Sequence, residues 1–102
     1  MKHIVLICAG GFSTNILATY IRKEMKEHEF DGDIKAMSEW NFQGLRQHVD
    51  VILLGPQLSF MHEEISRKYQ GTGTKVAMIN MADYGKMNGK RVFEQILNLL
   101  DE

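Results

Sequence analysis

The fold is decided by one stretch, which reads Ile4-Val5-Leu6-Ile7-Cys8-Ala9-Gly10-Gly11-Phe12-Ser13-Thr14-Asn15. Its apolar run, bounded by glycines, predicts a buried β-strand, and Ser13, Thr14 or Asn15 is then expected to cap the start of a helix. Cys8 therefore lies at the carboxyl end of the strand, where loop N–H groups and the positive end of the helix dipole favour an anion. A lone cysteine is more commonly a small buried hydrophobe. This loop favours instead a thiolate or a bound phosphate.

The composition indicates one ordinary globular domain spanning residues 1–102, with 44% hydrophobic and 25% charged residues. Twelve basic and thirteen acidic residues nearly cancel, so neither nucleic acid nor a membrane surface is an expected partner. The apolar run at the N-terminus is too short for a signal peptide, and no run is long enough to span a bilayer. One cysteine cannot form an internal disulfide, which fits a cytoplasmic protein. The cysteine and four histidines lack zinc-ligand spacing, so we expect no metal, no cofactor, and histidines at the surface or half-buried.

Apolar side chains recur alternately at strand spacing and at helix spacing along the chain. Strands are expected at residues 4–8, 34–37, 50–55 and 76–79, and helices at residues 16–27, 38–48, 58–69 and 92–100. The composition of residues 83–89 is that of a loop. Lys35 suggests that its strand lies near a sheet edge. Trp40 and Phe42 are expected to be packing residues rather than a stacking platform.

The alternation of strand and helix predicts a single three-layer α/β domain, with a four-stranded parallel sheet and helices on both faces. The first and third strands are the most continuously apolar, so they should lie side by side in the middle and give the order 2-1-3-4. Connections leave these two strands in opposite directions, which opens a crevice at their carboxyl ends. The loop after Cys8 and the turn Gly55-Pro56-Gln57 should both project into it.

The loop after the first strand has the composition of a cradle for a tetrahedral anion. Its members are Ala9, Gly10, Gly11, Phe12, Ser13, Thr14 and Asn15. Their backbone N–H groups can surround a phosphate, and the hydroxyls of Ser13 and Thr14 add donors. The same donors stabilise a thiolate and lower its pKa from about 8.5 in the free residue, which would make Cys8 nucleophilic at cellular pH.

A phosphoryl group on Cys8 could be hydrolysed or passed on. A cysteine phosphatase needs an arginine at the end of the cradle and a general acid for the leaving group. The candidate position for that arginine is Thr14, the nearest downstream arginine is Arg22 inside the predicted helix, and no Asp-Pro pair supplies the acid. A site lacking both should hold a phosphocysteine longer than it hydrolyses it, as a carrier does.

The alternatives are a small cysteine phosphatase or arsenate reductase, and a flavodoxin-like receiver or binding module. A receiver needs an acceptor aspartate at the end of its third strand, and this chain has Gly55 at that position, which argues against a receiver.

Three segments resemble the cytoplasmic IIB components of the lactose and cellobiose class of the bacterial phosphoenolpyruvate-dependent sugar phosphotransferase system. They are Cys8-Ala9-Gly10-Gly11-Phe12-Ser13-Thr14, Asp50-Val51-Ile52-Leu53-Leu54-Gly55-Pro56-Gln57 and Tyr84-Gly85-Lys86. The likeness covers nearly the whole chain. Loops of that family often read Cys-Ser-Ala-Gly-Met-Ser-Thr-Ser, and the departures here are Ala9, Gly10, Phe12 and Asn15. Such changes leave the backbone donors in place.

The resemblance implies that Cys8 accepts a phosphoryl group from a histidine of the IIA component and passes it to a sugar bound by the membrane component IIC. The implied sugar is a β-glycoside of the cellobiose, chitobiose or lactose type. Residues 9–15 would form the phosphate-binding cradle, with Pro56 and Gln57 as its neighbouring wall. Gln57 would either hydrogen-bond the phosphate or brace the loop, and Tyr84 would be a further supporting residue. The implied protein is a cytoplasmic phosphotransferase that meets the membrane only through IIC.

Overall fold

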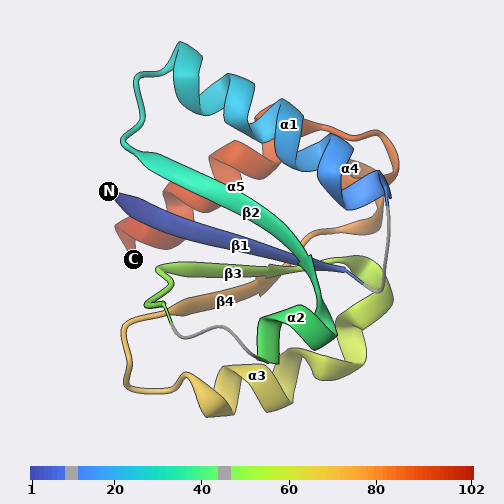
Figure 1. Cartoon of the computed structure of the whole chain (residues 1–102), viewed down its shortest axis with the longest axis vertical. Coiled ribbons are helices and arrows are strands. Elements are labelled where there is room, and N and C mark those ends of the chain that lie inside the picture. The colour runs from blue at the N-terminus through green and yellow to red at the C-terminus, as the bar shows by residue number, and fades with distance from the viewer. Residues whose placement is uncertain (9–11, 44–46) are drawn as a thin grey trace.

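Four parallel strands form one sheet in the order β2-β1-β3-β4 (Figure 1). The computed structural model describes residues 1–8, 12–43 and 47–102. The strands are β1 (Lys2–Cys8), β2 (Gly32–Ser38), β3 (Val51–Leu54) and β4 (Lys75–Met78). The predicted order is confirmed, and β1 and β3 are the central pair. Every residue of β3 and the last five of β1 are buried, as expected for strands covered on both faces.

Helices cover both faces of the sheet, which gives the predicted three layers (Figure 1). One face carries α1 (Phe12–Glu27), α4 (Met81–Gly85) and α5 (Gly89–Asp101), and the other carries α2 (Glu39–Gln43), the 3-10 helix η1 (Pro56–Met61) and α3 (His62–Lys68). The alternation of side chains along β1 divides its residues between the two layers. Ile4, Leu6 and Cys8 pack in the core with α1 and α5, whereas Val5 and Ile7 pack on the opposite face.

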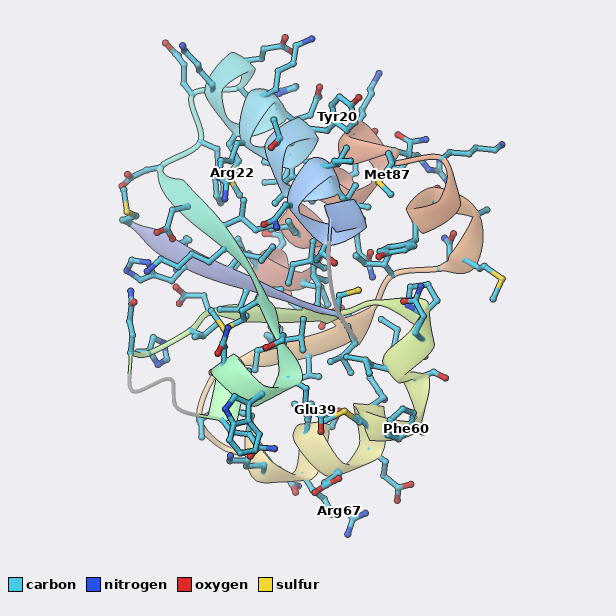
Figure 2. All side chains as sticks on the ribbon, turned by 45° about the vertical axis from the view of Figure 1, so that its right-hand side comes forward. Tyr20, Arg22, Glu39, Phe60, Arg67 and Met87 are labelled. Atoms are coloured by element: carbon cyan, nitrogen blue, oxygen red, sulfur yellow. The ribbon has the colours of Figure 1, made fainter. Side chains whose placement is uncertain are left out.

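Helices α1 and α5 pack closely because a glycine lies at their contact. A β-carbon on Gly89, the first residue of α5, would lie 2.7 Å from Cβ and 2.8 Å from the carbonyl carbon of Tyr20 on α1. Figure 2 shows Tyr20 beside Met87, which precedes α5 and packs against the same core. In Figure 2, Phe60 lies in the opposite layer with Glu39 and Arg67.

The predicted start of the first helix is wrong. Helix α1 begins at Phe12, so Ser13, Thr14 and Asn15 lie within its first turn and none of them is its N-cap. The helix places Thr14 inward, where this residue is only 2% exposed. A side chain that is packed against the core in this way contributes to the site rather than to the cap.

Two further boundaries differ from expectation. Helix α2 ends at Gln43, and His48 is not helical, whereas the predicted helix continued to His48; Leu45 lies outside the described residues. The helix cannot continue up to the next strand, because the backbone at Asp50 already pairs with β1: the Asp50 N–H donates to the His3 carbonyl at 2.8 Å. The segment predicted as loop 83–89 instead contains the last three residues of α4 and the first residue of α5.

The aromatic pair on α2 divides between core and solvent. Phe42 is buried, as predicted, but Trp40 is 82% exposed, so the prediction that it packs is wrong. The helix has only five residues and buries Phe42 alone, which leaves Trp40 facing away from the sheet. Lys35 does lie on an edge strand, β2. The four histidines are half-buried or exposed, as predicted.

Candidate active site

The candidate site is built around Cys8, the last residue of β1. Cys8 is 4% exposed, and its Sγ lies 3.2 Å from the phenol oxygen of Tyr84 in a side-chain hydrogen bond. Because β1 and β3 are the central strands, a crevice opens at their carboxyl ends, where the connections to β2 and to β4 leave in opposite directions. Cys8 thus occupies the position in which open α/β folds bind ligands.

Helix α4 brings Tyr84 to the sulfur. Asn80 caps this helix through its side-chain oxygen, which accepts the N–H of Asp83 at 2.8 Å, while the Asn80 amide donates to the Asp83 carboxylate at 2.9 Å. The Tyr84 N–H donates to the Asn80 carbonyl at 3.0 Å. The cap fixes the first turn of the helix. A side chain near its end then reaches back to the sheet.

The phenol of Tyr84 keeps its proton more strongly than a tyrosine in water. Burial raises the pKa of Tyr84, the neighbouring Cys8 raises it further, and Thr14 and Gln57 lower it in part. Burial has this effect because it disfavours the charged phenolate. The phenol is therefore a hydrogen-bond donor over the whole neutral range.

Thr14 contributes a buried hydroxyl from the first turn of α1. Its Oγ1 is inaccessible to solvent and has no hydrogen-bond partner among the described residues. The hydroxyl favours the phenolate form of Tyr84, so it acts on the phenol by proximity without completing a hydrogen bond. A buried hydroxyl that lacks a partner is costly and calls for an explanation. An anion that enters the site would be such a partner.

The turn after β3 forms another side of the site. The Gly55 N–H donates to the Ile7 carbonyl at 2.9 Å, which holds this turn against the end of β1. A β-carbon on Gly55 would lie 3.0 Å from Oε1 of Gln57 and 3.8 Å from Sγ of Cys8. The absence of that carbon leaves room for the Gln57 side chain within the turn beside Cys8. Pro56 is half-buried at the start of η1.

The structure brings together Cys8, Thr14, Gln57 and Tyr84, which the sequence singled out from four separate segments. The side chain of Asn15 is exposed. The structure describes Phe12 and Ser13 as helical backbone only, and Ala9, Gly10 and Gly11 lie outside the described residues.

Sequence reasoning missed two positions, Gly55 as a close-approach residue and Asn80 as a helix cap. The signal for the cap was present, because asparagine followed three residues later by Asp83 is typical of a helix start. A glycine at a strand end could likewise indicate a close approach of two side chains. Neither signal says which partner is approached.

The described residues contain no group of three or more histidine, cysteine, aspartate or glutamate side chains able to hold a metal ion. No helix in the same residues is long and apolar enough to cross a bilayer.

A family model for the lactose- and cellobiose-specific IIB subunit of the phosphotransferase system matches residues 3–95. The galactose-specific EIIB component of Lactococcus lactis subsp. cremoris is 35% identical over 105 residues, which cover 98% of this chain and 97% of that protein. The oligo-beta-mannoside-specific EIIB component of Bacillus subtilis is 31% identical over 100 residues, with the same coverage of both chains.

One solved structure and one longer relative extend the comparison. The cellobiose-specific IIB component of Borrelia burgdorferi is 31% identical and superposes with a TM-score of 0.77, covering 98% of this chain and 92% of that one. The lactose-specific EIICB component of Staphylococcus aureus is 25% identical over 85 residues, which are 83% of this chain but only 15% of that protein.

Proposed function

The chain belongs to the lactose- and cellobiose-specific IIB family of the phosphotransferase system, and we propose from this premise that it carries a phosphoryl group on Cys8 during sugar uptake. Members of the family are phosphotransferases. The proposal adds the residue and the direction of transfer. The donor is a phosphohistidine of a IIA component, and the acceptor is a sugar bound by a IIC membrane component.

One observation carries the proposal. The only cysteine ends a central strand at the carboxyl edge of the sheet, with the phenol of Tyr84 at 3.2 Å and the buried hydroxyl of Thr14 close enough to act on that phenol. Both hydroxyl groups can donate a hydrogen bond to an anion. A nucleophilic sulfur with donors next to it is suited to hold a phosphoryl group, because the donors stabilise the negative charge on either species.

The two transfers balance without any further reactant. In the first, the Cys8 thiolate attacks phosphorus, the S–P bond forms as the N–P bond of phosphohistidine breaks, and the imidazole keeps the electron pair. In the second, a sugar hydroxyl oxygen attacks phosphorus, the O–P bond forms, and the electron pair of the S–P bond returns to sulfur. The hydroxyl proton passes to water.

The proposed phosphate-binding residues are those of the loop and the first turn of α1, at positions 9–15. Pro56 and Gln57 form the neighbouring wall, since Oε1 of Gln57 and Sγ of Cys8 both lie close to the position that a β-carbon on Gly55 would take. Residues 1–102 act as one IIB domain.

The family and its relatives support the proposed partners. The EIICB relative joins a segment similar to this chain to a longer protein, which supports an encounter with IIC. The names of two relatives give cellobiose and oligo-beta-mannosides, which are β-glycosides and support a β-glycoside as the sugar. We place the protein in the cytoplasm, with transient encounters at the membrane through IIC.

The test is intact-mass measurement after incubation with a phosphorylated IIA component of the same class. Wild-type protein should gain one phosphoryl group, and Cys8→Ser should gain none, because a serine hydroxyl stays protonated near neutrality. Circular dichroism of the serine variant controls for folding. A phosphoryl group that still appears on folded Cys8→Ser would place the acceptor elsewhere, for example on one of the histidines.

A further inference from the structure

We infer that Tyr84 is the positioning residue of Cys8, and that its phenol donates a hydrogen bond to the sulfur in the ionised state. The contact at 3.2 Å between Sγ and the phenol oxygen carries the inference. The role in phosphoryl transfer rests on the proposed function. The hydrogen bond itself does not, so the two can be tested apart.

The direction of the bond follows from chemistry. Either atom can donate while Cys8 is a thiol. Once the thiol loses its proton, the sulfur can only accept, so the bond survives only with Tyr84 as donor. Burial and the adjacent sulfur raise the pKa of Tyr84, which keeps the phenol protonated when the thiolate forms. Tyr84 therefore stabilises the state of Cys8 that attacks phosphorus.

The side chains around the phenol of Tyr84 do not compete with it as the donor to the Cys8 sulfur. Three elements present a side chain that acts on it: β1 presents Cys8, α1 presents Thr14 and η1 presents Gln57. Of these three, only the cysteine titrates. The hydroxyl of Thr14 and the amide of Gln57 favour the phenolate, so they polarise the phenol and strengthen the hydrogen bond that it donates.

The fold holds Tyr84 firmly enough for positioning. Tyr84 is 8% exposed, and the Asn80 cap fixes the start of its helix. At the other end of α4, the Met87 N–H donates to the Tyr84 carbonyl at 3.1 Å, and the Asn88 N–H donates to the Asp83 carbonyl at 2.9 Å. Contacts at both ends of a five-residue helix restrict the directions in which the phenol can point.

Tyr84 should affect the transfer rate less than it affects the thiolate population. Loss of one hydrogen bond to a charged group corresponds to a rise of about one to two units in the thiol pKa. Below both midpoints the thiolate fraction then falls about 10- to 100-fold, but a more basic thiolate is more nucleophilic. The net expectation for Tyr84→Phe at such a pH is transfer about 3- to 16-fold slower.

The direct test is a pH titration of the thiolate by its ultraviolet absorbance. The signal of each protein is read below the onset of tyrosine ionisation as the difference from its Cys8→Ser counterpart, which isolates the only cysteine. Tyr84→Phe keeps the buried ring and should shift the midpoint upward by about one to two pH units. Tyr20→Phe, which changes a half-exposed tyrosine on α1, is the matched control and should leave it unchanged. A midpoint that stays or falls in Tyr84→Phe would overturn the inference.

A reciprocal measurement covers the case in which Tyr84→Phe does not fold. If Tyr84 donates to the thiolate, then Cys8→Ser removes the charge that holds the phenol proton. One tyrosine should consequently ionise at lower pH in Cys8→Ser than in wild type, as followed by tyrosinate absorbance. An unchanged tyrosine titration contradicts the inference. Shifted titrations without phosphorylation by IIA would instead uphold the Tyr84 bond and reject the proposed function.

Discussion

Replacing Thr14 by valine should stabilise the unphosphorylated protein while it slows phosphoryl transfer. Thr14 is 2% exposed, and its Oγ1 has no hydrogen-bond partner among the described residues. Valine keeps the branched shape and replaces the hydroxyl by a methyl group. The side chain therefore still fills its place on α1, and the helix keeps a β-branched residue at that position.

The magnitude follows from the burial of the hydroxyl. A buried hydroxyl without a partner costs about 1–3 kcal/mol, so its removal should raise the free energy of unfolding by about 1–2 kcal/mol. For a domain of 102 residues, this corresponds to an increase in Tm of roughly 4–10 °C. If the same hydroxyl binds the phosphoryl group, its loss should slow transfer from IIA by about 10- to 100-fold.

Calorimetry and transfer kinetics together check this prediction. The matched control is Thr19→Val on the same helix, where the exposed hydroxyl donates to the Asn15 carbonyl at 2.9 Å. Its stability change should stay within about 0.5 kcal/mol, and its transfer rate should be that of wild type. A Thr14→Val variant that is less stable than wild type would refute the reasoning, since the hydroxyl would then be contributing stability in the unphosphorylated state.

Two further substitutions test the fold. The backbone N–H of His3 donates to Asp50 and is the main reason that the pKa of this carboxyl is lowered. The stabilisation by Asp50 should be complete above its unfolded pKa near 3.8 and should disappear as the pH falls through the folded pKa. In urea unfolding, Asp50→Asn should accordingly have a lower free energy of unfolding than wild type at neutral pH, and this difference should disappear in acid. A difference that stays constant with pH would contradict the prediction. Gly89→Ala should lower the free energy of unfolding by about 1–3 kcal/mol, because the added β-carbon would clash with the backbone of Tyr20. Gly85→Ala, with nothing within 4 Å of the added carbon, is the control and should be neutral or slightly stabilising.

The sheet could be predicted from sequence because each strand carries its own signal. A strand that is buried on both faces must be apolar throughout, and the two strands with such runs are the central ones, β1 and β3. Their central position places Cys8 at the carboxyl edge without any knowledge of side-chain packing. The general location of the site was therefore accessible from periodicity alone.

The contacts within the site were not accessible in this way. Helix α4 has five residues, too few for an apolar period to emerge from a segment rich in loop residues. The approach of Tyr84 to Cys8 depends on how that helix lies against β1, which no local pattern encodes. The inward orientation of Thr14 likewise depends on a helix that begins earlier than its polar residues suggested.

Position 14 also bears on why this site would carry a phosphoryl group rather than hydrolyse it. An arginine there would have to place its guanidinium where a small hydroxyl is now enclosed near Tyr84. A buried guanidinium costs several kcal/mol unless an anion pairs with it, and a carrier spends part of each cycle without its phosphate. An uncharged hydroxyl costs less in that empty state. It also lacks the positive charge that would stabilise transfer of the phosphoryl group to water. Threonine in place of arginine at position 14 thus favours both the stability of the empty site and a long lifetime of the phosphocysteine.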